Sequence, residues 1–339
     1  MLILKRFFRK MVEINNYILF LSSGLLIIVS TSLIVLIEPQ TFPTFFDGFW
    51  WVMTTVTTVG YGDYSPVTAA GRWVAILLYI IGIGLIGIVI GKIIEGFALF
   101  KRKRLEGDIM YKDSNHFIII GWSQKAQFAV EEINDTNPDA EIIIIDQLKE
   151  APILKNNIHY IKGDASDRET LLKANINQSK AVLIFADDSL INKQITDGQT
   201  LMIASTIESL APHIHTVVEI LDERHIPNFK HARVDEFILS NETISSLAVR
   251  SAFRKGVSGI YSQLLSRSVG DDLFYIKRKT AWQTYRDAFE ELLSEGATLI
   301  ADKNDLTINR RLDDKLSQDS ELYVVCNQET YEKITGGKR

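Results

Sequence analysis

Cysteine is nearly missing from this chain of 339 residues, because Cys326 is the only one. A single cysteine excludes an intramolecular disulfide and a zinc site built from several cysteines. It also fits a protein that faces the reducing cytoplasm. Basic residues do not outnumber acidic ones, and a net charge of −5 gives no indication of nucleic-acid binding.

Charged residues are scarce in one part of the chain. Residues 1–100 carry charge mainly at their ends, whereas residues 101–339 have the mixed composition of a soluble α/β protein. The hydrophobic content of 46% is therefore an average over two different parts, and more than one domain is expected. No arginine-rich segment precedes the apolar part, which argues against a dedicated voltage-sensing domain.

Two long uncharged runs occupy the apolar part. Residues 17–37 are long enough to cross a bilayer as a helix, and too long for the apolar core of a signal peptide. Residues 73–90 form the second run. As one helix from Trp73 to about Phe100 this run would be roughly 42 Å long, which exceeds the thickness of the hydrocarbon core. The end of the second helix is therefore expected to protrude from the membrane.

Basic residues flank the two runs on one side only. They are Lys5, Arg6, Arg9 and Lys10 before the first run, and Lys101, Arg102, Lys103 and Arg104 after the second. The positive-inside rule then predicts that both termini, and with them the charged part of the chain, lie in the cytoplasm. The expected location is the plasma membrane, crossed more than once.

Between the runs lies the segment Thr57-Thr58-Val59-Gly60-Tyr61-Gly62-Asp63. Rings of backbone carbonyls can replace the water shell of a potassium ion, but the backbone must then enter conformations that most residues avoid. Gly60 and Gly62 are free to adopt them. The segment resembles the selectivity-filter signature of potassium channels, TVGYG followed by Asp. The resemblance implies a filter of Thr58, Val59, Gly60, Tyr61 and Gly62, with K⁺ as the permeant ion.

A short pore helix is predicted over residues 44–56, just ahead of the filter segment. Thr44 can cap this helix, and the negative end of its dipole would face the ion path. Trp50, Trp51 and Asp63 are expected to support the filter, and the resemblance implies that Trp51 braces Tyr61 from the side. An aromatic belt at the membrane interface is the alternative for the two tryptophans.

One chain supplies one filter loop, so a ring of carbonyls requires several chains. The resemblance implies four, in a symmetric homotetramer. The second run also contains several glycines, which in membrane helices often mark close packing. The alternative is a gating hinge or a wide cavity. The resemblance to calcium-gated prokaryotic channels places the hinge at Gly82, with Gly87 beside the cytoplasmic entrance.

A βαβ pattern opens the cytoplasmic part. A buried strand ends at Gly121, a helix follows, and a second buried strand ends at Asp146. This is the layout of a dinucleotide-binding unit with an acid after its second strand. The fingerprint is imperfect, because Ser123 stands where a glycine would let a pyrophosphate approach the backbone.

Strands and helices continue to alternate up to about residue 240. Roughly six parallel strands predict a doubly wound, Rossmann-like α/β sheet. One long helix is expected over residues 243–265, followed by a smaller α+β unit whose helix spans residues 282–294. The predicted domains are a two-transmembrane pore domain (1–100), a linker (101–114), a Rossmann-like domain (115–240), a crossover and dimerisation helix (241–265) and a C-terminal subdomain (266–339).

The whole chain resembles a bacterial two-transmembrane potassium channel with a regulator-of-potassium-conductance (RCK, or TrkA-like) domain. The resemblance is carried by the filter, residues 117–122, Gly163-Asp164 and the helix after Asn241. It implies that the cytoplasmic domains pair into a gating ring, and that the ligand is calcium or a nucleotide such as NAD, ADP or ATP.

The candidate ligand residues fall into two groups. The candidate nucleotide site comprises Gly121, Ser123, Gln124, Lys125, Asp146 and Asp164. The candidate calcium site comprises Glu219, which matches an acidic position of the calcium-gated relative, together with Asp187, Asp188 and Glu223. Calcium takes six to eight oxygens, so one matching carboxylate is not a complete site.

Other functions are weaker alternatives. A membrane-tethered nicotinamide oxidoreductase would explain the βαβ unit but not the filter, and no catalytic dyad or triad stands out, so an enzyme is not expected. A non-conducting sensor or regulatory subunit of a potassium transporter would normally lack the pore hairpin. Met110 lies where some relatives begin a separate soluble ring subunit, which could join the ring.

Overall fold

The computed structural model describes residues 15–188, 190, 192–265 and 270–336. The four basic residues that precede the first predicted span, Lys5, Arg6, Arg9 and Lys10, are not among the described residues. The chain divides into two compact units, one ending at Lys103 and the other beginning at Arg104.

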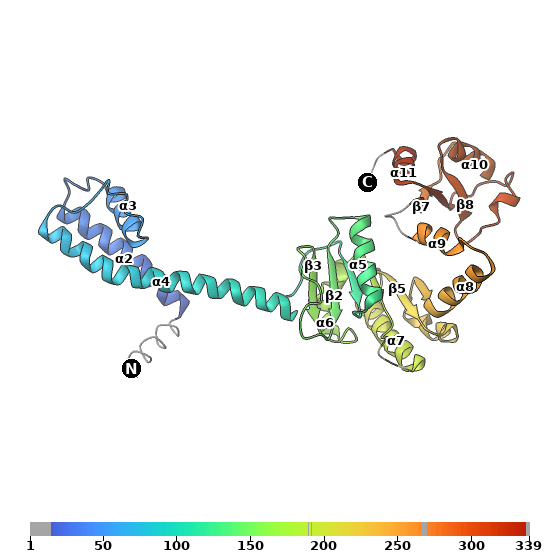
Figure 1. Ribbon diagram of the computed structural model, residues 1–339, viewed down its shortest axis with the longest axis horizontal. Helices are drawn as coiled ribbons and strands as arrows, with labels where there is room; N and C mark the ends of the chain where they lie inside the picture. The colour runs from blue at the N-terminus through green and yellow to red at the C-terminus, as the bar shows by residue number, and fades with distance from the viewer. Residues whose placement is uncertain (1–14, 189, 191, 266–269, 337–339) are drawn as a thin grey trace. The chain divides into compact units, whose positions relative to one another are not determined.

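The first unit contains the two predicted membrane helices and the short helix between them (Figure 1). They are α2 (Asn16–Ile37), α3 (Phe45–Val56) and α4 (Ala69–Glu106). Both α2 and α4 are long and apolar enough to cross a membrane. α4 extends beyond its predicted bounds at both ends, because Thr68 accepts the Gly71 N–H at its start and a stop signal comes only at Gly107, with φ of +74°.

The three helices share a small apolar core. Ile34 of α2, Val52 of α3 and Leu78 of α4 are almost completely buried in it. Most other apolar side chains of α2 and α4 are exposed within one chain. A surface of this kind is stable against lipid or neighbouring chains, not against water.

The second unit begins with the predicted parallel sheet of six strands. The strands are β1 (Phe117–Ile120), β2 (Ile142–Asp146), β3 (Ile158–Lys162), β4 (Ala181–Ile184), β5 (His215–Ile220) and β6 (Glu236–Leu239). Their order is β3-β2-β1-β4-β5-β6, and every pair is parallel. This order reverses direction next to β1, so a crevice opens there at the carboxyl ends of β1 and β4.

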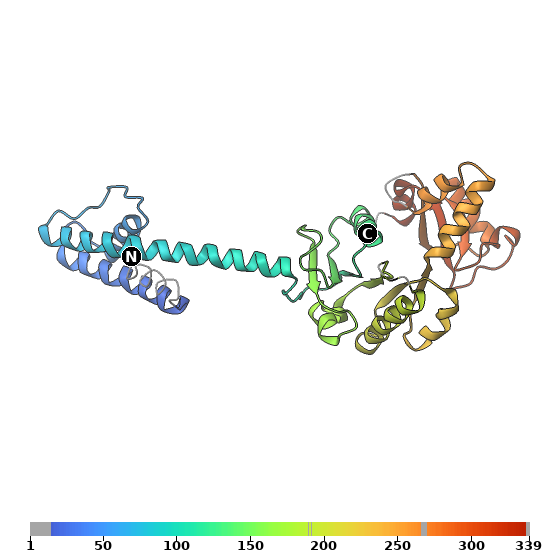
Figure 2. The same ribbon diagram turned by 60° about the horizontal axis from the view of Figure 1, so that its bottom comes forward.

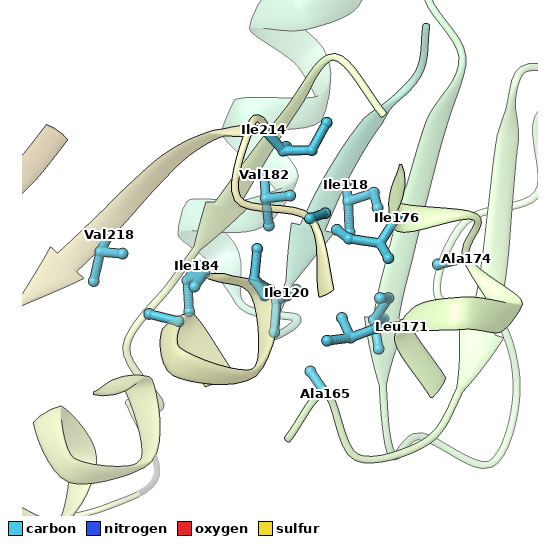
Figure 3. Packing of buried hydrophobic residues seen from close by; sticks show 14 of the residues in the cluster. Ile118, Ile120, Ala165, Leu171, Ala174, Ile176, Val182, Ile184, Ile214 and Val218 are labelled. Atoms are coloured by element: carbon cyan, nitrogen blue, oxygen red, sulfur yellow. The ribbon is translucent and has the colours of Figure 1, made fainter. Parts of the chain in front are cut away.

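Helices cover both faces of this sheet, so its strands are nearly continuous runs of buried isoleucine and valine. α5 (Gln124–Thr136) packs on the face that carries Ile119. α6 (Arg168–Lys173) and α7 (Lys193–Leu210) pack on the other face, where Ile118 and Ile120 lie. Figure 3 shows this second core, and the strands can be followed by colour in Figure 2.

The segment predicted as a linker (101–114) makes hydrogen bonds to the part of the second unit that contains the six-stranded sheet. Its first residues, up to Glu106, are helical and belong to α4. The Arg104 guanidinium donates to the carbonyl oxygen of Lys155 over 2.7 Å. The Lys162 N–H donates to the carbonyl of Gly107, and the Tyr111 N–H donates to a carbonyl at the end of α6.

The prediction of one long helix after the sheet is wrong. The structure has two helices, α8 (Ser240–Phe253) and α9 (Val257–Leu265). Arg254 between them is extended and Gly256 has φ of +94°, so the helical hydrogen-bond ladder cannot continue.

A smaller α+β part completes the chain, as predicted. It comprises β7 (Asp272–Lys277), α10 (Tyr285–Ser294), β8 (Thr298–Asp302), β9 (Glu321–Cys326) and α11 (Gln328–Thr335). The sheet is antiparallel, in the order β7-β9-β8. The prediction started α10 three residues early, at Trp282. A capping box of Thr284 and Asp287 begins the helix at Tyr285 instead.

Candidate functional site

A capping box fixes the start of the pore hairpin. The Thr44 hydroxyl accepts the Asp47 N–H, and the Asp47 carboxylate accepts the Thr44 N–H, as the sequence predicts for α3. The Tyr64 hydroxyl donates to the other Asp47 oxygen over 3.0 Å. The chain after the filter segment is thereby tied to the first turn of α3.

The backbone of the filter segment turns back on the end of α3. The N–H groups of Val59 and Gly60 both donate to the carbonyl oxygen of Thr54. Positive φ values recur at every second residue, with +63° at Thr58, +55° at Gly60 and +77° at Gly62. Glycine accommodates such values, as predicted, but a threonine at +63° was not expected from sequence.

Trp50, rather than Trp51, contacts the filter tyrosine within one chain. Its ring stacks on Tyr61 with centroids 5.8 Å apart and planes 5° from parallel. Its Nε1–H donates to the Asp63 carboxylate over 2.8 Å. Trp51 is buried and packs on Phe42, with ring centroids 5.4 Å apart. The predicted contact between Trp51 and Tyr61 is therefore not made inside a single chain.

Glu38, at the end of α2, is a buried residue that sequence reasoning missed. Its side chain is 3% exposed and accepts the N–H groups of Val67 and Thr68 and the hydroxyl of Thr68. These donors lie at the start of α4, so Glu38 joins the end of α2 to the start of α4. The sequence feature that could have identified Glu38 is an acidic residue directly after a long apolar run.

The two candidate hinge glycines differ in their surroundings. A Cβ atom at Gly82 would lie 2.9 Å from a methyl carbon of Val56, at the end of α3. Gly82 therefore permits close packing of α4 on the pore helix. No heavy atom would lie within 4 Å of a Cβ at Gly87. α4 is unbroken through both positions.

A cleft of about 670 Å³ opens at the carboxyl ends of β1 and β4. Gly121 lines this cleft and has φ of +85°. A Cβ atom at this position would lie 3.2 Å from the Phe185 carbonyl oxygen. Ser123 caps α5 by accepting the Ala126 N–H. The start of a 13-residue helix thus faces the cleft, as the βαβ pattern predicts.

Two acidic side chains of the candidate nucleotide site also line the cleft. Asp146 accepts the N–H groups of Trp122 and Gln147, each over 2.6 Å. Asp164 accepts the N–H and the hydroxyl of Ser166. Both carboxylates are held by loops at the carboxyl end of the sheet. Gln124 is exposed at the start of α5 and does not line the cleft.

Lys125 joins the two predicted ligand groups. Its ammonium contacts the Asp188 carboxylate over 2.7 Å and both oxygens of Glu219, over 2.9 and 2.8 Å. Burial by itself lowers the pKa of Lys125. The hydrogen bonds that its ammonium donates to the two carboxylates outweigh the effect of burial, so the pKa of Lys125 is raised above its ordinary value. Lys125 itself is not among the residues that line the cleft.

The remaining residues of the candidate calcium site are not brought together. Asp187 lines the cleft and is exposed, and Glu223 is exposed at the start of a 3₁₀ helix. The neighbouring Asp222 pairs with Arg224, which holds the pKa of this carboxyl far below its usual range. Among the residues that the structure describes, no group of three or more His, Cys, Asp or Glu side chains is placed to hold a metal ion.

Two protein families match the two units. A family described as "Ion channel" matches residues 21–98, which include all of α3 and the filter segment. The TrkA-N domain family matches residues 117–240, which is the six-stranded sheet with its helices.

Three known proteins place these matches in one chain. The Bacillus subtilis protein named "Putative potassium channel protein YugO" is 33% identical over 65% of this chain and 67% of its own length. The calcium-gated potassium channel TvoK of Thermoplasma volcanium is 29% identical over 69% of this chain and 67% of its own. The solved GsuK channel has the same fold at 16% identity, with a TM-score of 0.50, over 69% of this chain and 64% of the solved one. The chain belongs to the family of potassium channels that carry a TrkA-N domain.

Proposed function

We propose that this chain forms a potassium-selective pore whose opening is controlled by a ligand of its cytoplasmic sheet. The observation that carries the pore is the loop at the end of α3, where positive φ recurs at Thr58, Gly60 and Gly62. Alternation of this kind turns successive carbonyls toward one side, as a potassium filter requires. The end of α3 also directs the negative end of its dipole toward the loop.

Four copies complete the filter in this proposal. Val59 and Tyr61 are 54% and 68% exposed in one chain, so the loop has surface left for neighbours. The filter opens to the outside, and the TrkA-N sheets form a cytoplasmic ring below the membrane. Soluble copies that begin at Met110 can join this ring. Replacing Met110 by leucine should then remove a smaller protein band without changing the full-length one.

The pore is tested by potassium flux into liposomes that contain only the purified full-length chain. A Gly60→Asp variant should conduct no potassium. A residue with a side chain is strained at the backbone φ of +55°, and the aspartate adds a charge to the ion path. Gly24→Ala in α2 is the matched control, since its Cβ meets no atom within 4 Å. Potassium flux through Gly60→Asp would contradict the filter assignment. Absence of flux in the unmodified chain would favour a non-conducting regulatory subunit.

For the gating ligand, a nucleotide fits the cleft better than free calcium does. The start of α5 faces the cleft and offers backbone N–H groups to a phosphate, whereas the Gly121 N–H already donates to the Ile145 carbonyl oxygen. Asp146, at the end of β2, stands where an acid binds ribose hydroxyls in dinucleotide-binding folds. Calcium remains the second candidate, because the relative TvoK is named as calcium-gated. The relatives are named as channels, which gives no support to an oxidoreductase.

The ligand is tested by calorimetric titration of the full-length chain in detergent with NAD, ADP, ATP and calcium chloride. Binding of one nucleotide should be lost in Asp146→Ala and retained in Asp139→Ala, which changes an exposed acid in a turn. Equal nucleotide binding by both variants would contradict the placement of the ligand in this cleft. Opening should follow binding only if the ligand has different affinities for the open and closed ring.

A further inference from the structure

We infer that the Lys125 ammonium is a built-in cation, which occupies at the end of β5 the position that a free metal cation would otherwise take. The inference rests on the proposed function, because it assumes that a ligand of the cytoplasmic sheet controls the pore. It deepens that proposal by excluding calcium as the ligand at Glu219. Lys125 thereby makes this part of the ring independent of divalent cations.

Four oxygen atoms surround the Lys125 nitrogen. They are Asp188 Oδ1 at 2.7 Å, Glu219 Oε2 at 2.8 Å, Glu219 Oε1 at 2.9 Å and the Ala186 carbonyl oxygen at 3.4 Å. Carboxylate and backbone carbonyl oxygens are also the ligands that calcium takes in proteins. The nitrogen therefore marks a cation position made of hard oxygen ligands.

The burial of Glu219 explains why a cation is needed there. Its side chain is 4% exposed, and one of its oxygens also accepts the Ala186 N–H over 2.9 Å. A buried carboxylate without a compensating charge is strongly unfavourable, so it is found either paired or protonated. Lys125 supplies this charge from the first turn of α5, across the carboxyl edge of the sheet.

The same contacts tie the ammonium to the cleft. Ala186 and Asp188 belong to the loop after β4, which lines the cleft together with Asp146 and Asp164. The described charged residues of the lining are all acidic. Without Lys125, this edge would hold the Asp188 carboxylate close to the buried carboxylate of Glu219, with no positive charge between them. Such a group attracts a divalent cation, because attraction between opposite charges is stronger in a poorly solvated site.

A purely structural ion pair is the alternative, and calcium titration separates the two. The experiment uses the full-length chain in detergent. It compares this chain with the single variants Lys125→Met, Lys125→Arg and Glu219→Gln, and with the double variant Lys125→Met with Glu219→Gln. Methionine keeps much of the length of lysine and removes its charge. Calcium binding is measured by calorimetry, and thermal unfolding is followed with calcium chloride or with sodium chloride of equal ionic strength.

The unmodified chain and Lys125→Arg should show no calcium binding that depends on Glu219. Lys125→Met should bind calcium at least tenfold more tightly than the unmodified chain. Calcium, but not sodium, should restore its lowered unfolding temperature. The double variant should lose both effects, since it removes the buried charge together with its partner.

Two results would overturn the inference. One is calcium binding by the unmodified chain that disappears in Glu219→Gln. The other is a folded Lys125→Met variant that does not bind calcium, whether or not its stability is lowered, because a purely structural ion pair gives that result. If Lys125→Met does not fold in sodium chloride, folding in calcium chloride of equal ionic strength decides: recovery by calcium alone supports the inference, and no recovery in either salt overturns it. Failure of the unmodified chain to bind any nucleotide would contradict the proposed ligand but leave these calcium results unchanged.

Discussion

The filter loop and the cytoplasmic cleft both contain glycines with positive φ, but only the glycine of the cleft is closely packed within one chain. Around Gly60 and Gly62 no heavy atom lies within 4 Å of an added Cβ, and the neighbouring Val59 and Tyr61 side chains are exposed. Gly121 instead packs under the Phe185 carbonyl, at the edge of a sheet buried on both faces.

This difference indicates where each site obtains its geometry. The shape of the cleft is determined by a core that lies within one chain. Substitutions in this core should therefore lower folding stability first. The filter loop has hydrogen bonds to α3 and a stacked tryptophan. In the proposed tetramer its remaining surroundings come from neighbouring chains. Changes in the loop should therefore alter ion conduction while leaving the stability of the cytoplasmic unit unchanged.

The largest expected effect is on the cytoplasmic core. Ile143 is completely buried in β2, and Ile143→Ala should destabilise the cytoplasmic unit by about 2–5 kcal/mol through lost burial and the cavity left behind. Ile143→Val is the control and should cost about 0.5–1.5 kcal/mol. Denaturant unfolding of the full-length chain, followed by circular dichroism, measures both. A cost below that of the valine control would contradict the claim that this core determines the cleft.

Much of this core could be predicted from sequence, because isoleucine runs such as those of β1 and β2 have few other ways to be buried. The short helix α3 was equally accessible, since Thr44 and Asp47 form a local capping signal. Both features depend on residues that are close together in the chain. Periodicity and capping are local properties, and local properties are what a single sequence records best.

The parts that escaped prediction depend on distant residues or on an unfavourable backbone. Lys125 and Glu219 are separated by 94 positions, so the sequence does not show that they meet. Glu38 binds donors near Thr68 for the same reason. Thr58 adopts a conformation that threonine avoids, which the loop imposes through its hydrogen bonds to α3.

The next largest effect is expected at Gly62, in the filter loop. Alanine at a φ of +77° should cost roughly 1–2 kcal/mol of strain in each chain, with no clash to add to it. Because about 1.4 kcal/mol corresponds to a factor of ten, potassium flux of Gly62→Ala should fall at least about tenfold. The denaturation midpoint of the cytoplasmic unit should not change. A lowered midpoint with normal flux would reverse the proposed division between the two regions.

The third prediction concerns the hydrogen bond between Trp50 and Asp63. Trp50→Phe keeps an aromatic ring on Tyr61 but removes the donor to the carboxylate, a loss of about 1 kcal/mol at this exposed site. The loop should then hold its conducting conformation for a shorter time, and flux should decay faster after potassium is added. Trp73→Phe, at an exposed position of α4, is the control. Equal decay in both variants would show that the hydrogen bond does not stabilise the loop.

The smallest expected effect is a pH dependence of stability in the cytoplasmic unit, through His116. His116 precedes β1 and is completely buried, with Nε2 3.0 Å from the Ala174 carbonyl oxygen. Burial lowers the pKa of His116 despite that hydrogen bond. The unfolded chain, with an ordinary histidine pKa near 6.5, therefore takes up a proton more readily than the folded chain.

Stability linked to His116 should therefore be present above about pH 6.5 and fall as the pH decreases through that value toward the lowered pKa of the folded state. His116→Gln keeps an N–H donor for Ala174 and cannot titrate in this range. Between about pH 7.5 and about pH 5.5 this variant should lose less stability than the unmodified chain, whereas His231→Gln, at an exposed position, should behave like the unmodified chain. An identical pH dependence in all three proteins would show that the buried imidazole is protonated as easily in the folded chain as in the unfolded one.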